Sequence, residues 1–144
     1  MLIRHGNARH GSAERPVILI AAAGERPFHE AFTGAAVDRY GPGGEFWSEN
    51  PQLPRVPVQA WQIWNEQNSK SFLAPKPSTK SYAKLLESAS RAIRAADRRA
   101  DVVLGGMAEV AGVHGARTGW SYLRALYRRP GVERDFDGVA PHPY

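Results

Sequence analysis

Short apolar runs alternate with amphipathic stretches along this chain. The run Val17–Ile20 is rich in β-branched residues and is soon followed by a glycine, a pattern that predicts a buried β-strand. From residue 27 onward, apolar side chains recur at helical spacing, which predicts a helix that ends at the Gly-Pro-Gly-Gly sequence of residues 41–44. The side chains expected on the buried face of this helix are Phe28, Phe32, Ala35 and Ala36.

The middle of the chain predicts a second strand and the clearest helix. Residues 46–57 contain several prolines and are expected to form a loop, whereas the large side chains of Val58–Asn65 favour a strand. After a second proline-containing loop at residues 67–77, Ser78 is a suitable N-cap for a long helix. The apolar positions of that helix are Tyr82, Leu85, Leu86, Ala89, Ile93 and Ala96. Its arginines, interpreted as the solvated side of a surface helix, are Arg91, Arg94, Arg98 and Arg99.

Two further strands and one helix are predicted in the last third of the chain. Asp101–Gly106 is a short apolar run that ends in two glycines, and Phe136–Ala140 begins a strand that continues toward the last residues. A stripe at helical spacing between them predicts a helix closed by residues 130–131, with Trp120, Leu123, Leu126 and Tyr127 on one face. Strands and helices therefore alternate, which indicates right-handed βαβ units and a parallel sheet.

Two parallel architectures fit this alternation: an open doubly wound sheet and an arc of a (β/α)8 barrel. A nucleotide-binding doubly wound sheet usually carries a glycine-rich phosphate loop after its first strand. The corresponding turn here, residues 23–27, has one glycine and no G-x-G-x-x-G motif, so the open sheet gains no support.

Composition narrows the class of protein. The 144 residues, 42% hydrophobic and 23% charged, have the size and composition of one folded domain. The absence of cysteine excludes disulfides, thiolate metal sites and cysteine nucleophiles. A net charge of +5 permits anionic partners without establishing one, and no apolar run reaches the roughly 20 residues that span a bilayer. We expect neither a membrane segment nor a nucleic-acid partner.

The first residues allow two interpretations. Residues 1–15 are polar and basic, and together with the apolar run that follows they loosely fit a secretory signal. If residues 17–20 form a strand, residues 1–15 are instead a weakly ordered lead-in to a domain that spans residues 16–144. The cellular location stays open between these alternatives.

The most informative segment for chemistry is Trp61–Asn68, where polar residues follow the end of an apolar strand. In parallel α/β folds, sites assemble at the carboxyl ends of the strands. A carboxyl placed there beside tryptophans is partly desolvated, which raises its pKa toward the range that a general acid needs. Glu66 is therefore a candidate general acid, and Asn65 a candidate partner for a substrate hydroxyl. A strand end whose Asn-Glu pair only caps a loop explains the same residues without chemistry.

Trp64-Asn65-Glu66 and the strand before it resemble the W-N-E-P acid/base signature of the clan A glycoside hydrolases. This (β/α)8 superfamily contains cellulases, mannanases, β-xylosidases and α-L-iduronidases. Residues 39–47 and 82–106 are similar to the third helix, fourth helix and fifth strand of the β-xylosidase-like branch, and residues 136–144 to its sixth strand. The resemblance spans residues 16–144. It implies a partial TIM (β/α)8 barrel with about four parallel strands, numbered three to six, and three main helices.

The resemblance also implies roles for individual residues. Glu66 would be the general acid/base of a retaining glycosidase, and Asn65 would bind the 2-hydroxyl of the sugar. Trp64, His142 and Tyr144 would contribute to the sugar site, the last two through the terminal His-x-Tyr of the sixth strand. The implied substrate is a carbohydrate, and no cofactor or metal is implied.

Two departures from the family pattern affect what this chain can do. Gln67 stands where the family has proline, which changes the shape of the loop but leaves the chemistry in place. The nucleophile of the family is a second glutamate on the seventh strand, and a retaining site needs two carboxyls about 5–5.5 Å apart. The other carboxyls considered, none of which matches the nucleophile position, are Glu45, Glu49, Glu109 and Asp137. We therefore expect a fragment that is inactive alone.

Other functions are weighed against this expectation. The main alternative is a non-catalytic module that binds carbohydrate or a polyanion through Trp61, Trp64 and the arginines. A half barrel with open strand edges is also expected to fold marginally or to associate with a second copy. No metal site is expected, because the histidines are scattered and His29-Glu30 lacks the second histidine of H-E-x-x-H.

Overall fold

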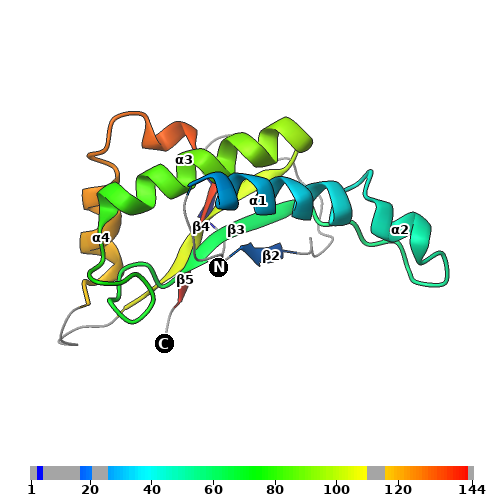
Figure 1. Ribbon diagram of the computed structural model, residues 1–144. Helices are drawn as coiled ribbons and strands as arrows, with labels where there is room; N and C mark the ends of the chain where they lie inside the picture. Colours follow the sequence, from blue (N-terminus) through cyan, green and yellow to red (C-terminus); the bar gives the residue numbers. More distant parts are fainter. Residues whose placement is uncertain (1–2, 5–16, 21–25, 110–115, 143–144) are drawn as a thin grey trace.

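A computed structural model describes residues 3–4, 17–20, 26–109 and 116–142, with five strands in one sheet (Figure 1). The strands are β1 (Ile3–Arg4), β2 (Val17–Ile20), β3 (Ala60–Asn65), β4 (Asp101–Ala108) and β5 (Gly138–His142). The helices are α1 (Arg26–Tyr40), α2 (Glu45–Glu49), α3 (Thr79–Ala96), α4 (Gly119–Leu126) and the 3-10 helix η1 (Val132–Arg134). The predicted α/β class is confirmed.

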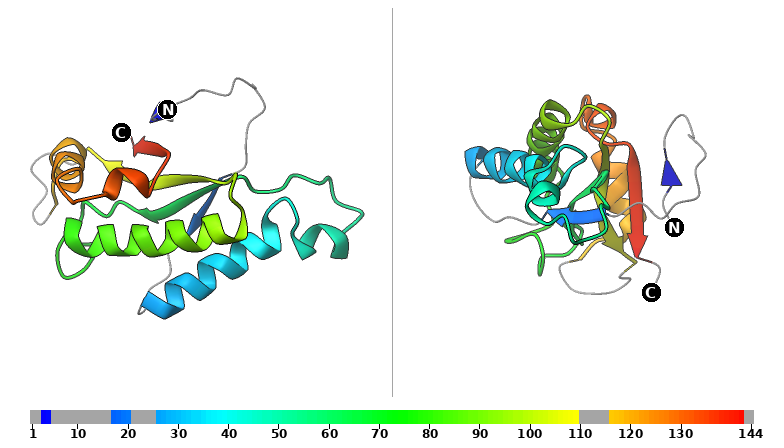
Figure 2. Two further views of the ribbon diagram at one scale, coloured as in Figure 1. Left: turned by 90° about the horizontal axis from the view of Figure 1, so that it is seen from above. Right: turned by 90° about the vertical axis from the view of Figure 1, so that its right-hand side faces the viewer.

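The sheet has the order β1-β5-β4-β3-β2, so β2 to β5 lie side by side in chain order. The pairings β2–β3, β3–β4 and β4–β5 are parallel, as the sequence predicts, and β1 is antiparallel to β5. The short strand β1 lies within the segment expected to be a weakly ordered lead-in, most of which is outside the described residues. Helices α1 and α3 pack side by side on one face of the sheet (Figures 1 and 2).

The core lies between the sheet and this helical layer. Trp61 and Ile63 of β3 and Val102 and Leu104 of β4 are almost completely buried there. Helix α3 begins as predicted, because the Ser78 side chain accepts a hydrogen bond from the Ser81 amide at 3.2 Å. Four of its predicted apolar positions are buried, whereas Leu85 is half-buried and Ala96 is exposed; the four are Tyr82, Leu86, Ala89 and Ile93.

The buried face of α1 differs from the predicted one. Phe32 is 47% exposed and Ala35 is also exposed, whereas His29, Thr33 and Val37 are buried; the Phe28 side chain lies outside the described residues. The physical reason is that α1 packs along α3, and Ser88, a small polar residue of α3, lies in that contact. Polar side chains fit that contact, as the 2.8 Å hydrogen bond from Ser88 to Glu30 shows. Hydrophobicity alone therefore selects the wrong face.

The predicted face of helix α4 is confirmed in part, because Leu126 is buried and Leu123 packs against the core. Trp120 is 76% exposed and Tyr127 is 38% exposed, whereas Gly119 and Tyr122 are buried. The Tyr122 ring packs edge-on against Tyr82 of α3, with ring centroids 6.3 Å apart. This contact turns Trp120 outward.

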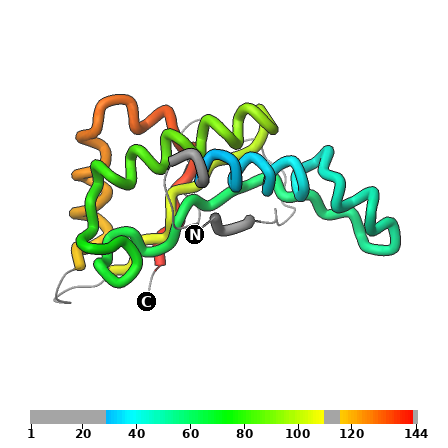
Figure 3. Tube along the Cα trace, in the orientation of Figure 1, coloured from blue at the N-terminus to red at the C-terminus, as the bar shows by residue number. Residues whose placement is uncertain are grey.

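The loop predicted at residues 46–57 contains the short helix α2. Glu45 in the first turn suits the helix N-terminus, and the prolines that suggested a loop start only at residue 51. Gly44 is required before the helix, because a Cβ there would lie 2.1 Å from the Arg39 carbonyl oxygen. The segment that contains α2 projects from the rest of the described molecule (Figure 3). Within the described residues, no helix combines the length and apolar character that crossing a bilayer requires.

Candidate functional site

The parallel strands bring three polar side chains to one edge of the sheet. Strand β3 ends at Asn65, β4 at Ala108 and β5 at His142, so Glu66, Glu109 and His142 lie at the carboxyl edge. The register supports this placement, because Asn65 of β3 pairs with Gly106 of β4, and Ala108 pairs with His142.

Glu66 and His142 are in direct contact, although they lie 76 residues apart in the chain. Nδ1 of His142 is 3.0 Å from Oε1 of Glu66, which is hydrogen-bond distance. The Glu66 side chain is 13% exposed and that of His142 is 23% exposed, so both reach solvent without projecting into it. The structure thus brings together two residues that the sequence assigned to one site from separate segments.

The backbone that presents Glu66 has an unusual conformation. Trp64 has φ of 71° and Glu66 has φ of 45°, values that are uncommon for residues other than glycine. The Glu66 amide donates a 2.6 Å hydrogen bond to the Gly106 carbonyl, which attaches this turn to β4. Strained backbone of this kind concentrates at functional sites.

Two glycines of β4 make room for the site. A Cβ on Gly106 would lie 2.0 Å from Nε2 of His142, so the histidine ring occupies the space that a side chain would fill. A Cβ on Gly105 would lie 2.7 Å from the carbonyl oxygens of both Ile63 and Trp64. Neither position tolerates a side chain without movement of β3 or of the histidine.

Tyr82 of α3 supports the same region from within the core. Its hydroxyl donates to the Ile63 carbonyl at 2.8 Å and accepts from the Gly105 amide at 2.9 Å, which bridges β3 and β4. Burial raises the pKa of Tyr82, so the hydroxyl stays protonated and able to donate at neutral pH.

The loop after Glu66 is fixed by two fully buried amide side chains. Gln67 donates to the Gly105 carbonyl at 2.9 Å. Asn68 donates to the carbonyls of Ala108 at 2.8 Å and Arg117 at 2.6 Å, which connects the loop to the segment before α4. The glutamine at position 67 therefore attaches the loop to β4.

The two tryptophans of β3 have different environments. Trp64 is partly exposed, and its ring nitrogen donates to the Phe72 carbonyl at 2.8 Å while its ring meets the edge of His29. Trp61 is completely buried in the core, so the expectation that it contributes to a binding surface is wrong. Tyr144 lies outside the described residues.

Three of the other carboxylates have partners of their own. Glu109 accepts from the Trp120 amide at 3.2 Å at the start of α4. Asp137 accepts from the Val102 amide at 2.9 Å and pairs with Arg94 at 3.3 Å. Glu49 pairs with Arg39 at 2.9 Å on the surface. These contacts give the three carboxylates structural roles.

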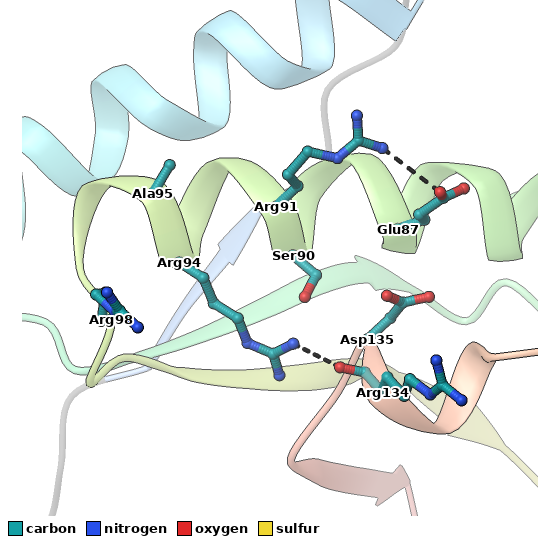
Figure 4. A pocket seen from close by; sticks show the side chains of 8 residues that line it. All are labelled: Glu87, Ser90, Arg91, Arg94, Ala95, Arg98, Arg134 and Asp135. Carbon is teal, nitrogen blue, oxygen red and sulfur yellow. Dashed lines mark hydrogen bonds and ion pairs between the residues drawn. The ribbon is translucent and has the colours of Figure 1, made fainter.

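A groove of about 820 Å³ lies between α3 and η1, and we call it the α3 groove (Figure 4). Its lining residues are Glu87, Ser90, Arg91, Arg94, Ala95, Arg98, Arg134 and Asp135. Arg91 pairs with Glu87 at 3.5 Å, and Arg94 contacts both the Arg134 carbonyl and Asp137. Burial and the neighbouring Glu87 raise the pKa of Asp135. The groove therefore mixes both signs of charge, as the predicted solvated helix face would.

The residues that hold the site together were not predicted from the sequence. Gly105 and Gly106 were interpreted only as the end of a strand, although consecutive glycines in a buried strand also mark a close approach of neighbouring groups. The burial of Gln67 and Asn68 could not be predicted, because a polar pair after a strand is typical of any exposed loop.

No family model matches this chain, and no curated protein matches it. Among the residues that the structure describes, no three histidine, aspartate or glutamate side chains are grouped as a metal site requires. The function is therefore inferred from the residues and geometry of the carboxyl edge.

Proposed function

We propose that this chain is an arc of a (β/α)8 barrel that carries the acid/base half of a retaining glycoside hydrolase site. Glu66 is the general acid/base, and Asn65 binds a sugar hydroxyl beside it. Trp64 and His142 line the sugar site, together with Tyr144. The substrate is a carbohydrate.

The winding of the sheet supports the barrel. In a doubly wound sheet, the strand order reverses at a switch point and helices cover both faces. Here β2 to β5 follow one another without reversal, and α1 and α3 pack on one face (Figure 2). Strands added in one direction with helices on one side are typical of a (β/α)8 barrel, whose helices form the outer ring.

The observation that carries the functional proposal is the contact between Glu66 and His142. An acid/base carboxyl must be positioned at the carboxyl edge of the strands and partly withdrawn from water. Glu66 meets both requirements, and the His142 ring holds one of its oxygens at 3.0 Å. The second oxygen of the carboxyl is the one that we assign to proton transfer with the glycosidic oxygen.

Retaining hydrolysis needs a second carboxylate. We assign it to a residue beyond Tyr144 or to a second copy of the chain. Strand β2 pairs only with β3 among the described strands, so its outer side can accept another strand. Light scattering tests the second-copy route: a monomer at all concentrations removes it and leaves the residue beyond Tyr144.

Binding of neutral oligosaccharides tests the site in this chain directly. In nuclear magnetic resonance titrations with xylo-, manno- and cello-oligosaccharides, one series is expected to shift the signals of Trp64 and His142. Asn65→Ala should weaken this binding about tenfold, because it removes a hydrogen bond to the sugar. Ser71→Ala, an exposed position in the following loop, is the control and should bind as the parent chain does. If no oligosaccharide shifts these signals, the proposal fails.

Turnover gives a second test. As a monomer, the 144-residue protein is expected to release no aryl group from a panel of aryl glycosides, whereas a protein extended beyond Tyr144 should hydrolyse one of them. In the extended protein, Glu66→Gln should reduce kcat about 10²–10⁴-fold for glycosides with poor leaving groups, which depend most on the general acid. Full activity of Glu66→Gln would contradict the assignment.

A further inference from the structure

A second groove, of about 420 Å³, lies along the outer side of α4, and we call it the α4 groove. Its lining residues are Arg117, Thr118, Trp120, Ser121, Arg124, Ala125 and Arg128. Trp120 is 76% exposed, more than any other large hydrophobic residue for which the structure describes an exposed side chain. Trp120 therefore presents most of its indole ring to solvent, where a ligand can stack on it.

The charged side chains that line the α4 groove are all cationic, and the carboxylate of Glu109 lies at the Trp120 amide beside the groove. Three arginines line the α4 groove, and none of its described lining residues is acidic. The α3 groove differs in this respect, because Glu87 and Asp135 line it and its arginines take part in ion pairs. Within the described part of the chain, Arg124 and Arg128 make no ion pair. The α4 groove is thus the more strongly cationic of the two.

The spacing of these side chains produces one continuous stripe. Trp120 and Arg124 are four residues apart on α4, so they lie on the same side about 6 Å apart along its axis. Arg128, in the turn after the helix, lines the same groove. Arg117 is held beside the stripe, because its guanidinium donates to the Ser121 carbonyl at 2.9 Å and lies over the Tyr122 ring. The groove therefore offers an aromatic face at one end and guanidinium groups along its length.

The stripe begins next to the carboxyl edge that carries Glu66. Asn68, two residues after Glu66, accepts a 2.8 Å hydrogen bond from the Arg117 amide and donates to the Arg117 carbonyl. Glu109, directly after β4, binds the Trp120 amide. The first turn of α4 is thus attached to the loop of the candidate site, and the stripe runs from there along the outside of the molecule.

We propose that the α4 groove binds an acidic polysaccharide, with Trp120 stacked on a sugar ring and Arg124 and Arg128 bound to carboxylates or sulfates of the following units. Aromatic faces stack on rings, and guanidinium groups bind carboxylates and sulfates through paired hydrogen bonds. The choice of carbohydrate over other polyanions rests on the proposed function, because the stripe starts at the Glu66 site. A polymer that extends beyond that site would follow α4.

The test measures binding of the 144-residue protein to polygalacturonate, with methyl-esterified polygalacturonate as the matched neutral polymer. We expect binding to the acid form only, with a loss of roughly ten- to fortyfold between 50 and 200 mM salt through counterion release at two or three arginines. Trp120→Ala should weaken binding about tenfold, and its exposure means that the variant should fold. Arg124→Gln combined with Arg128→Gln should weaken it by at least that much.

A charge-matched control separates this groove from general attraction. Arg98→Gln combined with Arg134→Gln removes the same charge from the α3 groove and should leave the affinity within about twofold. Equal loss in both double variants, unchanged binding of Trp120→Ala, or equal binding of the methyl ester would overturn the proposal. Tighter binding of oligo(dT) or of phosphatidylserine vesicles than of polygalacturonate would assign the groove to another partner and overturn it as well.

Failure here can be distinguished from failure of the proposed function. Glu66→Gln should bind polygalacturonate as the parent chain does, because Glu66 is not among the described lining residues of the α4 groove. Neutral oligosaccharides report on the Glu66 site and should be unaffected by Trp120→Ala. If polygalacturonate binding fails and neutral oligosaccharides bind, the α4 groove proposal is wrong. If neutral oligosaccharides fail and polygalacturonate binds, the proposed function is wrong.

Discussion

Along β3, Trp61 and Ile63 are buried beneath α3, whereas Trp64 and Glu66 directly after them have positive φ and partly exposed side chains. The neighbouring strand β4 changes in the same way, from large core residues to the pair of glycines at 105–106. The body of the sheet is stabilised by buried apolar volume, and the carboxyl edge consists of backbone turns and polar groups held at defined distances. A strand that packs in the core and also presents the polar groups of the carboxyl edge must therefore change abruptly in side-chain type where it reaches that edge.

This difference predicts two kinds of mutational effect. Substitutions in the body should reduce the free energy of unfolding in proportion to the volume removed. Substitutions at the carboxyl edge should act by displacing neighbouring groups. Their effect on the free energy of unfolding depends on whether backbone or a polar side chain must move.

Trp61→Ala should have the largest effect, because it removes a completely buried indole from the core. We expect a loss of about 3–5 kcal/mol in the free energy of unfolding measured in urea. Trp120→Ala makes the same chemical change at an exposed position and should stay within about 0.5 kcal/mol. Similar losses for the two variants would mean that α4 is not oriented as described.

Gly105→Ala should destabilise the protein by about 1–3 kcal/mol, although it adds only one methyl group. The new Cβ would lie 2.7 Å from the carbonyl oxygens of Ile63 and Trp64, and backbone cannot rotate away as a side chain can. Urea unfolding measures the loss. Gly34→Ala is the control, since a Cβ there meets nothing within 4 Å, and it should not destabilise. An unchanged free energy of unfolding in Gly105→Ala would show that β3 and β4 lie farther apart at the carboxyl edge than described.

Alkaline pH should destabilise the body through its buried tyrosines. Burial raises the pKa of both Tyr82 and Tyr122, so they keep their protons in the folded state at pH values where the unfolded chain loses them. Their contribution to stability is fully present below pH 10, the ordinary tyrosine pKa, and falls above it by about 1.4 kcal/mol per pH unit for each tyrosine. Thermal melts between pH 8 and 11.5 measure this slope. Tyr122→Phe should make it shallower, and an unchanged slope would contradict the burial of Tyr122.

The body of the sheet could be predicted from the sequence to a large extent, because hydrophobic periodicity reports burial. The strands β2 to β5 and the helix α3 with its Ser78 cap were all predicted, with bounds shifted by a few residues. The buried faces of α1 and α4 were predicted only in part, because contacts between helices decide them: Ala36 and Leu126 face the core, whereas Phe32 and Trp120 are exposed. Thr33 is buried while Phe32 is exposed, an outcome that no hydrophobicity scale anticipates.

The edge could be predicted only in part. The residue types at Asn65 and Glu66 indicated a site, and the family resemblance added His142. The contact between Glu66 and His142 depends on the register of three strands. The hydrogen bonds of Gln67 and Asn68 depend on the same register, as does the space above Gly106. Register is a property of the assembled sheet, so the sequence could indicate which residues take part but not how they meet.

Gly106→Ala should have the smallest effect on stability and the most specific effect on the edge. The new Cβ would lie 2.0 Å from Nε2 of His142, and the histidine ring can move whereas the backbone opposite Gly105 cannot. Loss of the contact between His142 and Glu66 costs about 0.5–1.5 kcal/mol, and replacing glycine within a strand returns about 0.5–1 kcal/mol of backbone entropy. The net change should therefore stay within about 1 kcal/mol.

The informative measurement on Gly106→Ala is the chemical shift of the imidazole protons of His142 at one fixed pH. In the parent chain this chemical shift should change when Glu66 is replaced by glutamine, because Oε1 of Glu66 lies 3.0 Å from Nδ1 of the ring. In Gly106→Ala the same replacement should have little effect, since the displaced ring no longer reaches the carboxyl. If Gly106→Ala leaves the response of His142 to Glu66→Gln intact, Gly106 is not what makes room for the contact between the two side chains. The description of the carboxyl edge as polar groups held at defined distances would then be wrong.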